Sequence, residues 1–256
     1  MLVYLIYLQV NKKVVFLFNY IYWFLFYIYR FMIDYIPILT TILSLYFFVE
    51  ILKHYLFRKK KYLFWWMIGV ATFGLGTLSE SIHTIIGHNE FNLRFWYILG
   101  ALLGGFPLAQ GTVYLLFSKK FANQSSLFFI SYILIASIFI LMVPIKITES
   151  FDGGLTGQVF EWQWVRFFSI PINIYAFTFL VGGAIYSAYK YSKFKNLIYK
   201  VYGNTAIAIG GILPGIGGSF TRAGYIEVLF VTEFFGLALI YAGYKIIKYN
   251  TTIQVS

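Results

Sequence analysis

WYILGALLGGFPLAQGTVYLL, residues 96–116, runs for 21 residues without a charged side chain. A helix needs roughly 20 predominantly apolar residues to cross the hydrocarbon core of a bilayer. The stretch therefore predicts a transmembrane helix, and it is one of several such stretches in the chain.

The composition of the whole chain agrees with a membrane protein. Of its 256 residues, 60% are hydrophobic and 11% are charged, whereas soluble domains carry about 25% charged residues. The net charge of +11 sits in short gaps between apolar runs, so we predict contact with lipid and no nucleic-acid partner. The absence of cysteine excludes disulfides and thiolate chemistry.

Seven apolar segments are long enough to span a bilayer. They cover residues 35–56, 62–86, 93–117, 126–147, 166–189, 203–221 and 225–247. Their connections are short except around residues 147–165, which leaves no room for a soluble domain. We predict an all-α, polytopic bundle over residues 34–248, followed by a short tail at 249–256.

The N-terminal region, residues 1–33, allows two interpretations. VVFLFNYIYWFLFYIY (14–29) is long enough for a short span, which would add an eighth helix. It could equally be an extension upstream of the first clear span. Neither alternative changes the seven core spans.

Basic residues predict the orientation. Thirteen Lys and Arg residues flank one end of the seven segments: Lys53, Arg58, Lys59, Lys60, Lys61, Lys119, Lys120, Lys190, Lys193, Lys195, Lys200, Lys245 and Lys248. The other end has only four: Arg94, Lys146, Arg166 and Arg222. Because cytoplasmic loops of membrane proteins are enriched in Lys and Arg, we predict a multi-pass cell-membrane protein with a cytoplasmic C-terminus.

Small residues mark two spans as close-packing elements. Gly100 and Gly104 are four residues apart in the third span, as are Gly211 and Gly215 in the sixth. Such spacing lets helix backbones approach closely in lipid. Pro214 should kink the sixth span, and we weigh a packing role there against a broken helix that binds an ion or substrate. Gln110, in the third span, is expected to form an interhelical hydrogen bond.

Five polar residues are predicted to share the outer half of the bundle. Counting about 1.5 Å per residue along each span places the following at similar depth: Glu80, His83, Asn173, Arg222 and Glu233. We predict that they line an outward-facing polar cup that binds a ligand, since ionisable groups within a membrane mark functional sites. The alternative is a structural Arg222–Glu233 pair, with Glu80 and His83 wetted at the interface.

Metal, cofactor and catalytic sites find little support. Glu80 and His83 match one Glu-x-x-His unit of a di-iron bundle, but those sites use two copies and the chain has no second one. Glu50 and His54 lie at the opposite end of the first span. We therefore predict no metal, no cofactor and no catalytic residues.

The predicted function follows from the cup. We expect a small-ligand or ion binding bundle of transport-like type. One alternative is a structural subunit that packs against other membrane subunits or against its own copies, and a second is a membrane-embedded enzyme, which the shortage of His, Asp and Cys disfavours.

Two stretches carry a resemblance to a known group. They are FWYILGALLGGFPLAQGTVYLLFSKK (95–120) and GGSFTRAGYIEVLFVTEFFGLALIYAGY (217–244). Together they resemble a family of uncharacterised prokaryotic seven-helix integral membrane proteins, with the likeness extending over residues 34–248. The resemblance implies the seven-helix fold, and it assigns no activity to the chain.

Overall fold

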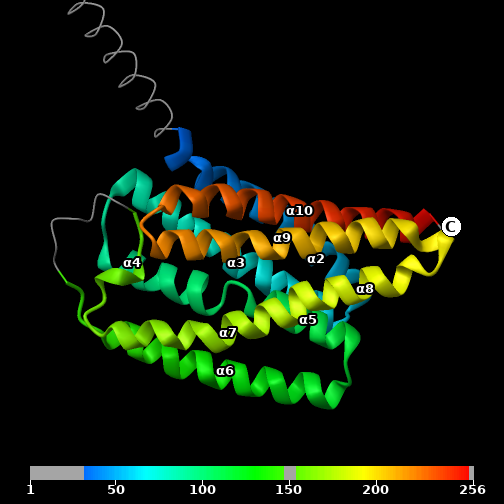
Figure 1. The fold of residues 1–256 in the computed structure, drawn as a ribbon, viewed down its shortest axis with the longest axis horizontal. Helices are drawn as coiled ribbons and strands as arrows, with labels where there is room; N and C mark the ends of the chain where they lie inside the picture. The colour runs from blue at the N-terminus through cyan, green and yellow to red at the C-terminus, as the bar shows by residue number, and fades with distance from the viewer. Residues whose placement is uncertain (1–31, 147–153, 254–256) are drawn as a thin grey trace, which may run out of the picture.

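The computed structural model describes residues 32–146 and 154–253. Within these residues the regular structure is helical, apart from one isolated antiparallel bridge between Ile145 and Phe160. The long helices run side by side along the longest axis of the molecule (Figure 1). The all-α bundle predicted from the sequence is thereby confirmed. The stretch at 14–29 lies outside the described residues.

Seven long helical segments make up the described bundle. They are α2 (Ile36–Arg58), α3 (Lys61–Ile86), α4 (Glu90–Trp96) continuing through π-helix η1 (Tyr97–Leu102) to α5 (Phe106–Leu116), α6 (Lys119–Met142), 3-10 helix η4 (Gln163–Phe168) continuing through α7 (Ser169–Ala176) and π-helix η5 (Phe177–Val181) to α8 (Gly182–Ser192), α9 (Ile198–Arg222) and α10 (Ile226–Ile253). Six of these segments are long and apolar enough to cross a membrane, and the glycine-rich α9 is the exception.

The bundle has two ends, which we name by what lies there. The loop end carries the turns at 87–89 and 223–225 and the connection between α6 and η4. The C-terminal end carries the turns at 59–60 and 117–118, the α8–α9 connection and the end of α10. Each end thus collects the connections that the alternating direction of the helices predicts.

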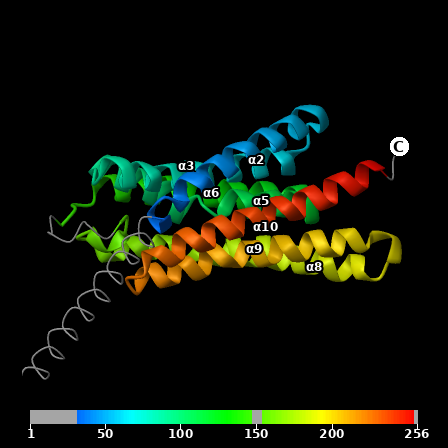
Figure 2. The same cartoon turned by 90° about the horizontal axis from the view of Figure 1, so that it is seen from above.

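The helices form a closed ring. Going round it, each of α2, α3, α5, α7–α8, α9 and α10 packs on the next, and α10 returns to α2. Helix α6 packs outside this ring, against α5, η1 and η4. Seen from above, α2 and α3 lie on one side, α8 and α9 on the other, and α10 between them (Figure 2).

Helix α5 is the most enclosed element. Every residue from Phe106 to Val113 is buried, which is expected of an apolar helix surrounded by others. Glycines allow its neighbours to approach. A Cβ on Gly69 of α3 would meet Leu108 at 2.6 Å, and a Cβ on Gly105 would meet Ala176 of α7 at 2.7 Å.

The third segment is interrupted where the sequence predicts one continuous span. Helix α4 widens into η1, where the N–H of Leu103 donates to the carbonyl of Ile98 at 2.9 Å, five residues back. The chain leaves helical geometry at residues 103–105 and resumes as α5 with a proline in its first turn. Pro107 has no N–H, so it would remove a hydrogen bond inside a helix but is well tolerated at the start of one.

Helices α9 and α10 approach through facing glycines. The carbonyl oxygen of Gly236 lies 2.5 Å from where a Cβ on Gly210 would stand, and that of Gly210 lies 2.8 Å from the corresponding position on Gly236. Gly203 and Gly243 repeat this reciprocal contact two turns further along, at 2.9 and 2.3 Å. Backbones this close exchange Cα–H···O contacts that a side chain would prevent.

Gln110 joins three helices. Its side chain is fully buried and its Nε2 donates to the carbonyl of Ala122 on α6 at 2.8 Å. Its Oε1 accepts from the hydroxyl of Tyr175 on α7 at 2.6 Å. The interhelical hydrogen bond expected of this residue is present, and Gln110 holds the third, fourth and fifth segments together.

Candidate functional site

Glu80 lies on α3 inside the bundle, in a row of buried polar residues. The hydroxyls of Ser79 and Ser81 donate to carbonyls one turn back on their own helix, those of Leu75 and Thr77. Such bonds satisfy a hydroxyl without outside help. A carboxylate can only accept, so Glu80, which is 2% exposed, depends on donors from elsewhere.

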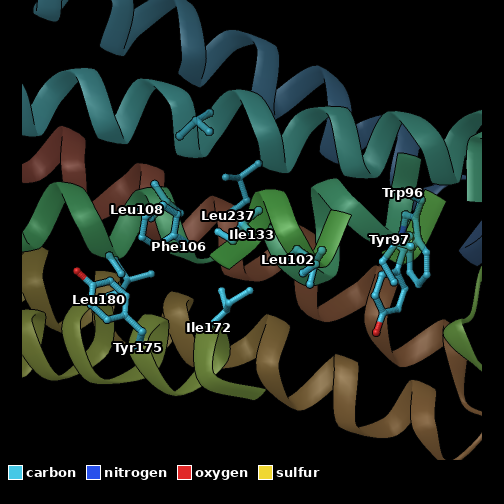
Figure 3. Close-up of a cluster of buried hydrophobic side chains, with 14 of the residues drawn as sticks. Trp96, Tyr97, Leu102, Phe106, Leu108, Ile133, Ile172, Tyr175, Leu180 and Leu237 are labelled. Carbon is cyan, nitrogen blue, oxygen red and sulfur yellow. The ribbon is translucent and has the colours of Figure 1, made fainter. Parts of the chain in front are cut away.

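Trp96 supplies one donor. Its indole Nε1–H donates to Oε1 of Glu80 at 2.9 Å, and both side chains are buried. Trp96 is the last residue of α4 and stands with Tyr97 at one end of the buried cluster, while Phe106 and Tyr175 stand at the other (Figure 3). This role could not be predicted from the sequence, because a tryptophan in an apolar helix usually indicates packing alone.

Glu233 of α10 is the second acid. Its carboxyl group lies within hydrogen-bond reach of the Glu80 carboxyl. Helices α3 and α10 both flank α2, so the two side chains meet on the inner side of the ring. Oε2 of each carboxyl group is buried and has no hydrogen-bond donor.

No basic side chain compensates these two acids in the described part of the chain. The ion pairs there join Glu90 to Arg94 at 4.0 Å and Glu50 to Lys245 and Lys248 at 3.4 Å each. Glu50, at the C-terminal end, therefore has two cations, whereas Glu80 and Glu233 have none within this distance.

Among the described residues, therefore, no basic side chain compensates the charge of the pair. Two buried carboxylates side by side repel one another and have lost their hydration. A proton shared between them would remove one charge and supply the missing donor between the carboxyl groups. A small cation would act in the same sense, so the Glu80–Glu233 pair is chemically a binding site for a proton or a small cation.

His83 extends the site toward the loop end. It is three residues beyond Glu80 and on the same face of α3, and its Nδ1 is buried without a hydrogen-bond partner. The His83 ring meets the ring of His88 edge to face, with centroids 6.4 Å apart. His88 is exposed at the start of the 87–89 turn region, so this imidazole pair leads from the interior to the surface.

Three atoms stand out across the described residues. Glu80 Oε2, Glu233 Oε2 and His83 Nδ1 are the buried side-chain oxygen and nitrogen atoms there that lack a hydrogen-bond partner. Buried polar groups are normally satisfied, and each exception calls for a bound water, an ion or a chemical role. All three belong to the loop-end half of α3 and α10.

Two of the five residues predicted for the cup lie elsewhere. The structure brings Glu80 and Glu233 together, with His83 one turn away. Asn173 is exposed on α7. The Arg222 side chain is exposed and makes no ion pair with Glu233 among the described residues, while its carbonyl accepts from Gln158 Nε2 at 3.1 Å. Neither lines the carboxyl pair.

Some of the glycines predicted to pack between helices do so, and others do not. Gly100 faces Gly76 of α3, whose Cβ would lie 3.7 Å from its backbone, and Gly104 lies in the interruption before α5. Gly211 faces Val181 at 3.1 Å, whereas Gly215 is exposed with no atom within 4 Å of its Cβ position. Helix α9 continues through Pro214.

The closest α9–α10 contacts instead use glycines seven residues apart. They are Gly203, Gly210 and Gly217 on α9 and Gly236 and Gly243 on α10. A seven-residue repeat keeps one side of a helix toward its partner. The α9–α10 contact could therefore have been predicted from the seven-residue spacing of these glycines, whereas the prediction considered only four-residue spacing.

The described side chains can also be tested for a set of metal ligands. Among residues 32–146 and 154–253, no three His, Cys, Asp or Glu side chains come close enough together to hold a metal ion. Glu80, His83 and Glu233 therefore do not form a three-ligand metal site in the described part of the chain.

The fold defines the class of protein: an all-α bundle whose long, apolar helices have the dimensions and composition of membrane spans. No family model, curated protein or solved structure matches the chain.

Proposed function

We propose that this protein is an integral membrane protein that binds a small ligand or ion, of the kind transporters carry, at the Glu80–Glu233 pair. The observation that carries the proposal is the pair itself: two carboxyl groups in contact, each with a buried Oε2, and no basic side chain paired with either among the described residues. Ionisable groups within a membrane domain are costly and mark ion or substrate sites.

In this proposal α9 is the seventh span and the loop end faces outward. Helix α9 lies along α10 over its length and beside α8 near the C-terminal end (Figure 1). Its lower hydropathy reflects glycines that the α10 contact requires. The turns at the C-terminal end carry Lys59, Lys60, Lys119 and Lys120, which favours placing that end in the cytoplasm of a cell.

Depth and backbone geometry support a binding role. Glu80 and Glu233 each lie about 10 Å from the loop end of their helix by helical rise, which in this proposal places the site in the outer half of the membrane. The π-helix η1 follows Trp96 directly, and π-helical turns often occur at functional sites. A shift in η1 would move the indole that holds Glu80.

Thermal stability of the protein in lipid nanodiscs tests the proposal. Ligands that bind only the folded state raise its melting temperature with concentration. Protons, sodium and potassium are the probes, with choline as the ionic-strength control. We expect at least one probe to stabilise the wild type and to lose its effect in Glu233→Gln.

Glu227→Gln, on the same helix and less deeply placed, is the matched control and should respond as the wild type does. An equal response in Glu233→Gln and the wild type for every probe would contradict the proposal.

One observation favours a second candidate, a subunit of a larger membrane assembly. Gly215 and Gly218 on α9 have no atom within 4 Å of their Cβ positions, and Gly215 is exposed. Small residues of this kind accept a neighbouring helix in lipid. Replacing Gly215 by cysteine and crosslinking in the native membrane would produce a covalent adduct under this candidate and none if that face meets only lipid.

A further inference from the structure

We propose that the ion held by Glu80 and Glu233 is a proton, and that it exchanges with water at the loop end through His83 and His88. This inference rests on the proposed function and adds the identity of the ion and its route. The exposed imidazole of His88, the half-buried imidazole of His83 and the carboxyl pair follow one another from surface to interior.

The packing around the pair favours a proton over a larger ligand. Glu80 is 2% exposed, and both Oε2 atoms are buried. Trp96 already occupies Oε1 of Glu80. A proton needs no space and turns the contact between two acceptors into a hydrogen bond.

The three unpartnered atoms define the inner part of the route. Glu80 Oε2, Glu233 Oε2 and His83 Nδ1 are all buried, and His83 stands about 4.5 Å further along α3 than Glu80. In the proposal a water molecule carries the proton between them, since buried waters bridge polar groups that lack a protein partner. That water joins the imidazole to the carboxyl pair.

The outer part of the route is the imidazole pair. His83 and His88 lie edge to face at 6.4 Å between centroids, and His88 is exposed. Imidazole accepts a proton on one nitrogen and releases one from the other, which makes histidine a proton carrier near neutral pH.

The transfer involves only N–H and O–H bonds. A proton from water at the surface binds to a ring nitrogen of His88 and passes to His83. His83 releases the proton on its inner nitrogen to the bridging water, and that water gives a proton to the carboxylate pair. The pair then carries one negative charge instead of two.

The other charged side chains at the loop end do not take the place of His83 and His88 in carrying the proton. They are Asp34 before α2, Glu90 and Arg94 on α4, Lys146 and Glu161 in the α6–η4 connection, Arg166 on η4, Arg222 on α9 and Glu227 on α10. Arg94 donates to the carbonyls of Ile140 and Val143 at 2.7 and 2.8 Å, and the Arg222 side chain is exposed. The charged group acting on Glu233 is Glu80.

Infrared difference spectroscopy of the protein in nanodiscs tests the inference. A protonated carboxyl group has a distinct C=O stretching band, which shifts when deuterium replaces the proton. We expect such a band in the wild type and its loss in Glu80→Gln and in Glu233→Gln. The rate of its shift after mixing with D₂O measures exchange.

His83→Ala should slow this shift by on the order of a hundredfold, the lower end of what a positioned acid–base side chain contributes to proton transfer. The band itself should remain, and added imidazole should restore the rate. His88→Ala, at an exposed position, should slow the shift without affecting folding. His54→Ala, at the C-terminal end, is the control and should leave the rate unchanged.

The outcomes separate the two proposals. The route would be overturned if the band shifted in D₂O at the wild-type rate in both His83→Ala and His88→Ala. Absence of any band that depends on Glu80 and Glu233 would overturn the assignment of a proton. The proposed function would stand in either case as long as a cation still stabilises the wild type and not Glu233→Gln.

Discussion

Trp96 holds one oxygen of Glu80 at 2.9 Å and leaves the other oxygen for Glu233. The indole thus sets the orientation of a carboxyl group that two different helices share. This contact links the end of α4, where the third segment begins to depart from α-helical geometry, to the acid on α10.

Replacing Trp96 by phenylalanine tests this contact. The aromatic ring is kept, but the donor to Glu80 is lost, and leaving a buried acceptor unsatisfied costs about 1–3 kcal/mol. We expect the free energy of unfolding in mixed micelles to fall by that amount. Trp162→Phe, at an exposed tryptophan, should change it little. Equal effects of the two substitutions would show that the indole donor contributes nothing.

The two kinds of acid in the bundle should respond differently to neutralisation. Glu233→Gln replaces one of two uncompensated carboxyl groups by an amide that can donate to Glu80, so stability should be unchanged or raised. Glu50→Gln removes the partner of Lys245 and Lys248 and should lower stability by about 0.2–1 kcal/mol, since these ion pairs are partly exposed. Denaturant titration of both variants checks the signs, and a marked loss in Glu233→Gln would contradict the shared-charge argument.

The glycine contact between α9 and α10 predicts a contrast within one helix pair. A Cβ on Gly236 would lie 2.8 Å from the Gly210 carbonyl oxygen and 3.0 Å from Pro214 Cδ. Gly236→Ala should therefore destabilise the protein by about 1–3 kcal/mol, as overpacking does. Gly215→Ala meets no atom and should be neutral or slightly stabilising. Thermal unfolding measures both, and equal tolerance would show that the helices separate easily.

Tyr175→Phe tests the polar contact inside the central helices. It removes the hydroxyl that donates to Gln110 Oε1 at 2.6 Å and should cost about 0.5–1.5 kcal/mol. Tyr186→Phe, on the exposed surface of α8, is the matched control. If both variants unfold alike, the bonds of Gln110 to the Ala122 carbonyl and the Ser125 hydroxyl hold it without Tyr175.

Some of the candidate site follows from the sequence because depth along a helix depends only on residue count. A fixed rise per residue put Glu80 and Glu233 at similar depth, and the structure brings them together. Asn173 and Arg222 have the same depth but are exposed. Their direction depends on the rotation of each helix about its axis, which neighbouring helices set.

Pro107 and Pro214 show that backbone geometry, too, cannot be predicted from the sequence alone. Both signal a weak point in a span, yet only the span with Pro107 is interrupted. At Pro214 the carbonyl that loses its donor, that of Gly210, lies against Gly236 of α10. A neighbouring backbone therefore compensates the proline, and no local pattern reveals that neighbour.

The sequence by itself determined the all-α class and the apolar segments. The length of an apolar segment is a local property, and burying that segment in lipid or in the core stabilises it directly. The sequence also determined which connections share an end, since consecutive spans alternate in direction. Only the tertiary structure decided which side chains face one another: Trp96 with Glu80, Glu80 with Glu233, and the glycines of α9 with those of α10. These contacts depend on helix rotation and close packing between segments far apart in the chain, which the residue order alone does not specify.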